Sequence, residues 1–285
     1  MNTLAHDTIA RANVLEFKGD MSTATRNRLA MRDLLDGIRL WPLAWTLAWL
    51  DIRLRYRGSV LGPFWLTLST AVMVGTLGLL YSTLFHVDVQ EYLPYLALSQ
   101  VLWFFLSTVV NESCSAFTQA ENIIRAVRMP YFTHALQTLV RNVLVLAHNI
   151  VVIVVVDLIF QVWPGWHALL AVPAFAVWIV DSLAICLLLG AFCARFRDVG
   201  PIVGSIMQIA FFVTPVLWQP EQLGRHAVLL PLNPFFVLIE IVRAPLLGHV
   251  PSNATWVAAV LYSLILCAAS WTLFVRARGR VAFWF

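Results

Sequence analysis

The sequence predicts an all-α membrane protein with six transmembrane helices, an N-terminal amphipathic interface helix and a re-entrant periplasmic helical hairpin before the last span. Three observations support this fold class. Hydrophobic residues make up 60% of the chain and charged residues 12%, and the mean hydropathy is +0.80. Residues 60–85 contain no charged side chain, and this stretch exceeds the roughly 20 residues that cross a bilayer as a helix. Arginines gather at the ends of such stretches, so the net charge of +4 does not indicate a nucleic acid partner.

The hydropathy pattern predicts six spans, at about 60–85, 94–110, 138–160, 168–193, 199–217 and 256–275. With the N-terminus inside, the predicted cytoplasmic segments hold sixteen of the nineteen Lys and Arg residues. Because such residues are retained on the cytoplasmic side, we expect a multi-pass protein with both termini in the cytoplasm.

Three regions follow along the chain. Residues 1–32 are polar, lack an apolar signal-peptide core and are expected to form a mobile cytoplasmic tail. Residues 33–58 are expected to form an amphipathic interface helix, the gate helix, and a basic entry, and residues 59–285 the six-span domain. Apolar residues recur at helical spacing in the second region: Leu34, Ile38, Trp41, Trp45, Trp49 and Ile52. This stripe favours a helix in the membrane interface with its tryptophans at headgroup depth; a helix packed on its own protein is the alternative.

The segment 226–250 is apolar but cannot form one continuous helix, because prolines interrupt it. They are Pro231, Pro234 and Pro245. The same segment carries Glu240 and Arg243. Two short helices dipping into the outer leaflet fit this pattern, and irregular backbone at that depth must be buried in protein or line a cavity.

Four ionisable residues lie inside the predicted spans: Arg141, His148, Asp157 and Asp181. Charges in spans usually face a bundle interior or a cavity, so a proton relay is one interpretation. The other is that Arg141 and Asp157 reach the nearer membrane interface along their side chains, which leaves Asp181 alone.

The chain lacks a glycine-rich phosphate loop, an HExxH motif and a GxSxG motif. The cysteines have no metal-ligand spacing and are interpreted as packing residues; they are Cys114, Cys186, Cys193 and Cys267. We therefore expect no catalytic residue, bound cofactor or metal in this chain. Aromatic residues are abundant, with twelve Trp, eighteen Phe and six Tyr. Most are expected to be membrane anchors, although flat aromatic faces also suit sugar rings in a conduit.

Four stretches carry a family pattern. They are DIRLRYRGSVLGPFW (51–65), ENIIRAVRMPYF (121–132), ARFRDVGPIVGSIMQIAFFVTPVLWQP (194–220) and LNPFFVLIEIVRAPLLG (232–248). In their order and topology they resemble the membrane-spanning subunit of ABC-2-type exporters of bacterial polysaccharides such as O-antigen and capsule. The resemblance implies a homodimer paired with two copies of a separate P-loop ATPase, which binds ATP and Mg.

The resemblance also implies three groups of site residues. A substrate gate for the pyrophosphate or headgroup of the lipid comprises Arg53, Arg55, Tyr56 and Arg57. An ATPase-coupling segment comprises Glu121, Asn122, Arg125, Arg128 and Pro130. Conduit aromatics are Phe64, Trp65, Tyr81, Phe211, Phe212 and Trp218. Guanidinium groups bind phosphate oxygens well, but the gate arginines could equally serve topology alone, and the coupling segment could be an ordinary loop.

The function expected from these features is export of a lipid-linked polysaccharide, of O-antigen or capsular type, across the bacterial inner membrane. The chain would be the permease and not an enzyme, since ATP hydrolysis would reside in the partner. Two alternatives stay open: an ABC-2 exporter of a drug or small lipid, and an ion-coupled secondary carrier. No internal repeat with paired broken helices supports the carrier.

Overall fold

The computed structural model describes residues 22–62, 64–127 and 129–284, and the part of the chain so described is helical, with no strand. Residues 1–21, most of the predicted tail, lie outside it. The elements are α2 (Thr23–Arg39), α3 (Trp41–Arg55), α4 (Phe64–Phe85), α5 (Val89–Gln119), α6 (Glu121–Ala126), α7 (Tyr131–Phe160), η1 (Gly165–Leu170), α8 (Ala171–Arg195), α9 (Val199–Val213), η2 (Pro220–Leu232), α10 (Pro234–Leu246), α11 (Asn253–Ala277) and η3 (Val281–Phe283).

Five described helical runs are long and apolar enough to cross a membrane: α4, α5, α7, η1 with α8, and α11. The pair η2 and α10 passes the same test together, although it is bent by 109°. These runs confirm the predicted all-α membrane architecture. That the bent pair is a re-entrant periplasmic hairpin stays a prediction.

The fifth predicted span, 199–217, is shorter than expected. Its helix, α9, has 15 residues, and at about 1.5 Å per residue it falls short of a hydrocarbon core of about 30 Å. The helix ends because Pro215 disfavours the helical conformation at Thr214, whose backbone is extended (φ −86°, ψ 137°).

The irregular segment after α9 is buried against α5. Val216 is fully buried and Leu217 is 8% exposed. Tyr95 Oη lies 2.8 Å from the carbonyl oxygen of Pro215 and 2.9 Å from that of Trp218, and Tyr92 donates to the carbonyl of Leu217. Backbone acceptors freed by the end of α9 therefore find donors inside the protein, as non-helical chain at membrane depth requires.

Helix α5 is the centre of the bundle and contacts α4, α7, α8, α9 and α10. In the most apolar stretch of α5, 78% of the residues are buried, whereas the figure is 17% for the corresponding stretches of α4 and of α11. Close approach of α4 depends on Gly78, where an added Cβ would lie 2.9 Å from Leu93 of α5. Helix α4 thus packs through one narrow face and leaves most of its apolar surface to lipid or to another chain.

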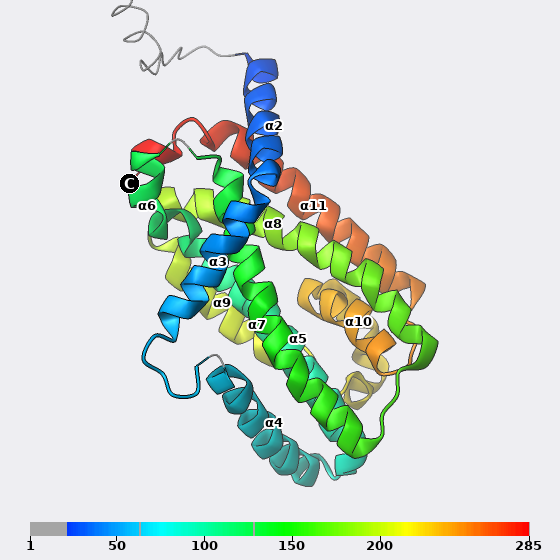
Figure 1. Ribbon diagram of the computed structural model, residues 1–285. Helices are drawn as coiled ribbons and strands as arrows, with labels where there is room; N and C mark the ends of the chain where they lie inside the picture. Colours follow the sequence, from blue (N-terminus) through cyan, green and yellow to red (C-terminus); the bar gives the residue numbers. More distant parts are fainter. Residues whose placement is uncertain (1–21, 63, 128, 285) are drawn as a thin grey trace, which may run out of the picture.

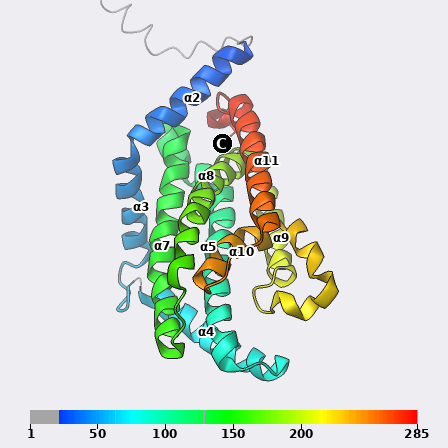
Figure 2. The same ribbon diagram turned by 90° about the vertical axis from the view of Figure 1, so that its right-hand side faces the viewer.

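Helix α3 lies along the outer side of α7, whereas α2 packs on the start of α7 and extends beyond the bundle (Figures 1 and 2). Helix α2 begins at Thr23 behind an N-cap by Ser22, ten residues before the boundary predicted at residue 33, so the predicted tail includes helical turns. A break at Leu40, followed by Pro42 in the first turn of α3, separates the two helices.

The predicted apolar stripe faces away from the bundle. Trp41, Trp45 and Trp49 are exposed, whereas the face of α3 that packs on α7 consists of Ala44, Ala48 and Ile52. Two members of the predicted stripe depart from it, since Leu34 packs against the core and Ile52 belongs to the buried face. The break at Leu40 also divides the stripe between two helices, where one was predicted. The small alanines allow α3 to pack closely on α7, and the tryptophans lie on the opposite, exposed face of α3.

The C-terminus and α6 lie at one end of the bundle, close to the region where α2 and α11 meet (Figure 1). The C-terminal end of α4 and the start of α5 lie at the opposite end. That the end carrying α6 faces the cytoplasm stays a prediction.

Candidate gate and coupling site

The basic entry lies at the end of α3 and in the loop that follows it. Arg53 and Arg57 are exposed and form no hydrogen bond or ion pair with any described residue. Arg55 differs, because its Nη2 donates to Glu112 Oε1 at 3.2 Å. Partial burial raises the pKa of Tyr56 above its usual value of 10, against the opposing charge of Arg55, so its hydroxyl remains a hydrogen-bond donor. The four predicted gate residues therefore split into two free arginines, one paired arginine and a neutral tyrosine.

A cluster of charges joins α3 to the bundle. Arg141 Nη1 donates to Asp51 Oδ2 at 2.8 Å, and its Nη2 and Nε donate to Glu112 Oε2 at 2.9 and 3.0 Å. The Arg141 side chain is only 8% exposed. Together with Arg55, these residues place two positive and two negative charges at the meeting point of α3, α5 and α7, so the buried charges compensate one another. We call Asp51, Arg55, Glu112 and Arg141 the ion cluster.

Two amides complete the ion cluster. Gln137 Nε2 donates to Asp51 Oδ2 at 2.8 Å, and Asn142 Nδ2 donates to Glu112 Oε2 at 2.8 Å. Both amides come from α7, on the same face as Arg141. The carboxylates of α3 and α5 are therefore held by one polar face of α7.

Arg141 therefore has ion-pair partners within the protein. The alternative considered from the sequence, an Arg141 side chain that only extends to the membrane interface, does not describe these contacts. The other charges predicted for a relay lie elsewhere: Asp181 accepts from Ser263 Oγ of α11 at 2.8 Å, and Asp157 lies in the last turn of α7. Among the described residues, no hydrogen bond or ion pair links these three side chains. The geometry does not assemble the proton relay considered from the sequence.

A cavity of about 360 Å³ adjoins the ion cluster. Its walls are α3, α7 and the junction of α5 with α6. The polar lining residues are Asp51, Arg55, Gln119, His134, Gln137, Thr138 and Arg141. His134 is 2% exposed, and neither ring nitrogen has a hydrogen-bond partner in the part of the chain that is described. The gate helix and the coupling segment thus share one polar cavity.

The predicted coupling segment forms the short helix α6 between α5 and α7. Glu121 begins this helix, Asn122 is exposed on it, and the backbone of Arg125 lies in its last turn. Pro130 is the N-cap of α7. Arg128 lies outside the described residues. The segment is therefore a helix as expected, while its contact with an ATPase stays a prediction.

A second buried acid ties the helices together at the same end. Asp33 of α2, with a side chain 1% exposed, accepts from Arg278 Nε at 2.9 Å and from the backbone N–H of Phe132 at 3.1 Å. Gly37, one turn further, has no room for a Cβ, which would lie 2.7 Å from Phe132. The start of α7 and the end of α11 are thus fixed to α2.

The predicted conduit aromatics fall into two groups. Phe64 and Trp65 are exposed at the start of α4. At the other end of α4, Tyr81 packs in a cluster with Phe211 of α9. Phe211 also lies 5.2 Å, between ring centroids, from the exposed Phe212.

Trp218 closes the second group of aromatics. Its indole N–H donates to the carbonyl of Phe212 at 3.1 Å. The structure thus brings the tyrosine of α4 and the aromatics at the end of α9 together, and leaves the first pair of α4 apart.

A buried arginine fixes the end of α9. Arg243 of α10 is 1% exposed, and its Nη1 donates to Tyr95 Oη, Ser99 Oγ and the carbonyl of Pro215 at 2.7, 3.0 and 2.6 Å. Glu240, one turn earlier, is its ion-pair partner. The sequence analysis noted both charges but could not identify the partners of Arg243. Tyr95 and Ser99 lie more than a hundred residues before it in the chain.

Sequence reasoning missed Glu112 and Asp33 entirely. Glu112 lay just past the predicted end of the second span at residue 110, yet α5 continues to Gln119. The available signal was Arg141, because a charge inside a span requires an opposite charge or polar partner near the same depth.

The long apolar helices, with the short helix α6 between two of them, define a multi-pass membrane protein. Residues 42–247 match the model of the ABC-2 type transporter family, and the chain belongs to this family. It is 25% identical over 236 residues to the O-antigen export system permease protein RfbA of Myxococcus xanthus, covering 81% of this chain and 91% of that protein. It is 19% identical over 191 residues to the protein of the same description from Klebsiella pneumoniae, covering 66% and 74%.

Proposed function

We propose that this chain is the permease of an ABC exporter that moves a lipid-linked polysaccharide, of O-antigen or capsular type, across the bacterial inner membrane. Two copies of the chain would work with two copies of a P-loop ATPase, with both termini of each permease in the cytoplasm. The observation that carries the proposal is the similarity to an O-antigen export permease over 91% of its length, within the family shown by residues 42–247.

The gate geometry supports a substrate with a pyrophosphate. Arg53 and Arg57 are exposed and have no partner among the described residues, so their guanidinium groups are available to an anion at the end of α3. Arginine binds phosphate oxygens through paired N–H donors, and the neutral Tyr56 adds a hydroxyl donor. Arg55 is less available, because it is tied to Glu112.

The ion cluster supports a route from an ATPase to the gate. Helix α6 and the gate helix α3 border one cavity, and Arg141 links α3 directly to α5 and α7. Rigid elements joined in this way can transmit a displacement. A push on α6 would therefore pass through α5 and α7 to the end of α3 and shift Arg53 and Arg57 with it.

The exposed aromatics support a conduit completed by a second copy. Phe64, Trp65 and Phe212 all stand on apolar faces of α4 and α9 that no described element covers. Such rings offer weak, repeated contacts to sugar rings that slide past. The remaining exposed apolar surface of α4 would face lipid.

The test is reconstitution of the chain with its co-purifying ATPase in liposomes that contain the host's own lipid-linked polysaccharide. We expect ATP-dependent appearance of the glycan on the trans side. Export of a lipid or drug without glycan would favour the other ABC-2 function, and transport driven by an ion gradient without an ATPase would contradict the proposal.

A further inference from the structure

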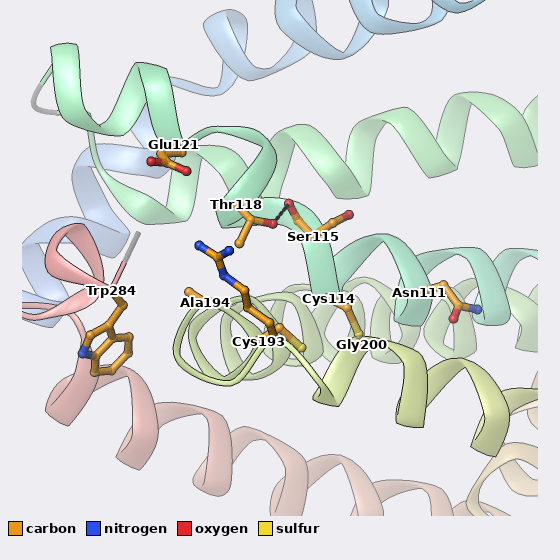
Figure 3. A pocket seen from close by; sticks show the side chains of 10 residues that line it. Asn111, Cys114, Ser115, Thr118, Glu121, Cys193, Ala194, Gly200 and Trp284 are labelled. Atoms are coloured by element: carbon orange, nitrogen blue, oxygen red, sulfur yellow. Dashed lines mark hydrogen bonds between the residues drawn. The ribbon is translucent and has the colours of Figure 1, made fainter.

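A second and larger cavity lies at the end of the bundle that carries α6. It has a volume of about 550 Å³, within the range of roughly 300–1,000 Å³ typical of small-molecule sites. Side chains from α5, α6, α8 and the start of α9 line it, together with Trp284 near the C-terminus. Figure 3 shows Asn111 at one end of the cavity and Glu121 and Trp284 toward the other, with Cys114 and Cys193 between them.

The cavity follows from the pattern of two facing helices. Asn111, Ser115 and Thr118 of α5 recur at helical spacing and present a polar face to the cavity. Opposite them α9 carries Gly200 and Gly204. A Cβ at Gly200 would lie 3.8 Å from Cys114, and one at Gly204 would lie 3.6 Å from Asn111 Oδ1. Because glycine has no side chain, α9 does not fill the space beside the polar face of α5 with apolar groups.

The lining offers hydrogen-bonding groups that are not used up by the protein. Asn111 donates to the carbonyl of Ser107 at 2.8 Å, but its Oδ1 has no donor among the described residues. Arg197, in the turn before α9, is exposed and has no described partner. The hydroxyls of Ser115 and Thr118 donate to carbonyls of their own helix at 3.2 and 3.1 Å, and their oxygens can still accept from a ligand. One end of the cavity therefore offers an acceptor, and another wall a guanidinium donor.

These groups match the chemistry of a sugar ring. Neighbouring ring hydroxyls donate and accept at once, as amide, hydroxyl and guanidinium groups require, and the flat indole of Trp284 suits the C–H face of a pyranose. The lining contains one acidic and one basic side chain, Glu121 and Arg197. A purely apolar ligand would leave these polar groups unsatisfied.

We propose that this cavity binds a short stretch of pyranose units of the exported glycan. The idea rests on the proposed function and adds a sugar site to it, separate from the gate at Arg53 and Arg57. Because Glu121 begins α6 and Gly200 lies in α9, a bound sugar would touch both the coupling segment and a conduit helix. Occupancy of the cavity would thus be sensed where the ATPase is expected to act.

The cysteines provide a direct test. Cys114 and Cys193 line the cavity, whereas Cys267 lies on α11 and outside it. The full chain, in lipid nanodiscs with its ATPase and under reducing conditions, is treated with a small thiol-alkylating reagent, and modification of each cysteine is followed by mass spectrometry. The probes are delipidated oligosaccharides released from the host's own surface polysaccharide and, separately, inorganic pyrophosphate.

We expect the oligosaccharides to slow modification of Cys114 and Cys193, pyrophosphate to have no such effect, and Cys267 to react equally in all samples. Equal modification with and without oligosaccharide would overturn the sugar site, as would protection by pyrophosphate alone. If ATP-driven glycan export holds while protection is absent, the cavity proposal fails and the proposed function stands. If neither is found, both fail.

A matched pair of variants separates binding from folding. Thr118→Val removes a hydroxyl in the cavity that also bonds to the carbonyl of Ser115 at 3.1 Å. Thr272→Val removes an equivalent bond, to the carbonyl of Ala269 at 2.9 Å, on α11 away from this cavity. We expect Thr118→Val to weaken oligosaccharide binding about three- to tenfold, as for one neutral hydrogen bond, and Thr272→Val to leave it unchanged. Equal affinities for the two variants would contradict the proposal.

Discussion

Arg141 Nη1 lies 2.8 Å from Asp51 Oδ2 and joins the middle of α7 to the end of α3. The same guanidinium group binds Glu112 of α5. These contacts place an almost fully buried charge between the gate helix and the central helix of the bundle. Because a buried charge is stable only with its partners, the packing of α3 on the bundle depends on this side chain.

The first prediction concerns this dependence. Arg141→Met leaves Asp51 without a cationic partner and Glu112 with Arg55 alone, so we expect a loss of about 3–5 kcal/mol in the free energy of unfolding. Chemical unfolding in mixed micelles measures it. The control is Arg39→Gln, an exposed arginine paired only with Asp36, whose loss should cost about 1 kcal/mol or less.

The same cluster allows a compensating experiment. Arg141→Met combined with Asp51→Asn and Glu112→Gln removes the unpaired charges, and we expect this triple variant to be more stable than Arg141→Met alone. If the triple variant instead loses as much unfolding free energy as the three single substitutions added together, the cluster does not act as a charge-balanced unit.

The second prediction concerns the gate. Arg53→Gln with Arg57→Gln should lower binding of a lipid pyrophosphate and reduce its dependence on salt, while the thermal midpoint stays within a few degrees of the unmodified chain. The reason is that neither arginine has a partner among the described residues. Titration of the purified chain with the lipid at low and high salt provides the measurement.

Arg55→Gln is the informative comparison for the gate. Its guanidinium is bound to Glu112, so its loss is expected to affect stability as well as binding. If the Arg53 and Arg57 double variant binds the lipid as well as the unmodified chain, these arginines do not bind the substrate. They would then serve only to orient the chain in the membrane.

The third prediction concerns the end of α9. Tyr95 Oη accepts from Arg243 and donates to carbonyls of the irregular segment after Val213. Tyr95→Phe leaves those buried groups short of a partner, and we expect a loss of about 1–3 kcal/mol in unfolding free energy. Thr108→Val, which removes only a bond within α5, should cost clearly less; equal losses would contradict the assigned role.

The helices were predictable from the sequence because long apolar runs have few alternatives in a bilayer. Their ends were not. Helix α5 runs nine residues past the predicted end at 110, to Gln119. Polar side chains such as Ser107 and Ser113 lower the hydropathy of this part of the chain. They form hydrogen bonds within their own helix and so do not end it. Helix α9 ends early at a proline whose effect is local.

The candidate site was predictable only in part. The arginines of the basic entry stood out by number. Sequence spacing does not show that Arg55 is paired, while Arg53 and Arg57 have no partner in the described part of the chain. Asp33 and Arg278 lie 245 residues apart, so their ion pair follows from tertiary packing alone. The tryptophan stripe of α3 has helical period, yet period does not reveal which face is lipid and which is protein.

The fourth prediction concerns the conduit. Phe212 and Ile209 are both exposed on α9, at 61% and 64%, but only Phe212 offers a flat ring, and it packs edge-on against Phe211. Phe212→Ala should slow glycan export while ATP hydrolysis by the complex persists, because sugar contacts are lost and the core is untouched. Ile209→Ala removes comparable exposed apolar surface and should leave the export rate unchanged. Export into liposomes and ATP hydrolysis, measured on the same preparations, give both rates. If the two variants slow export equally, the aromatic ring has no special role, and α9 faces lipid or the second copy at this position.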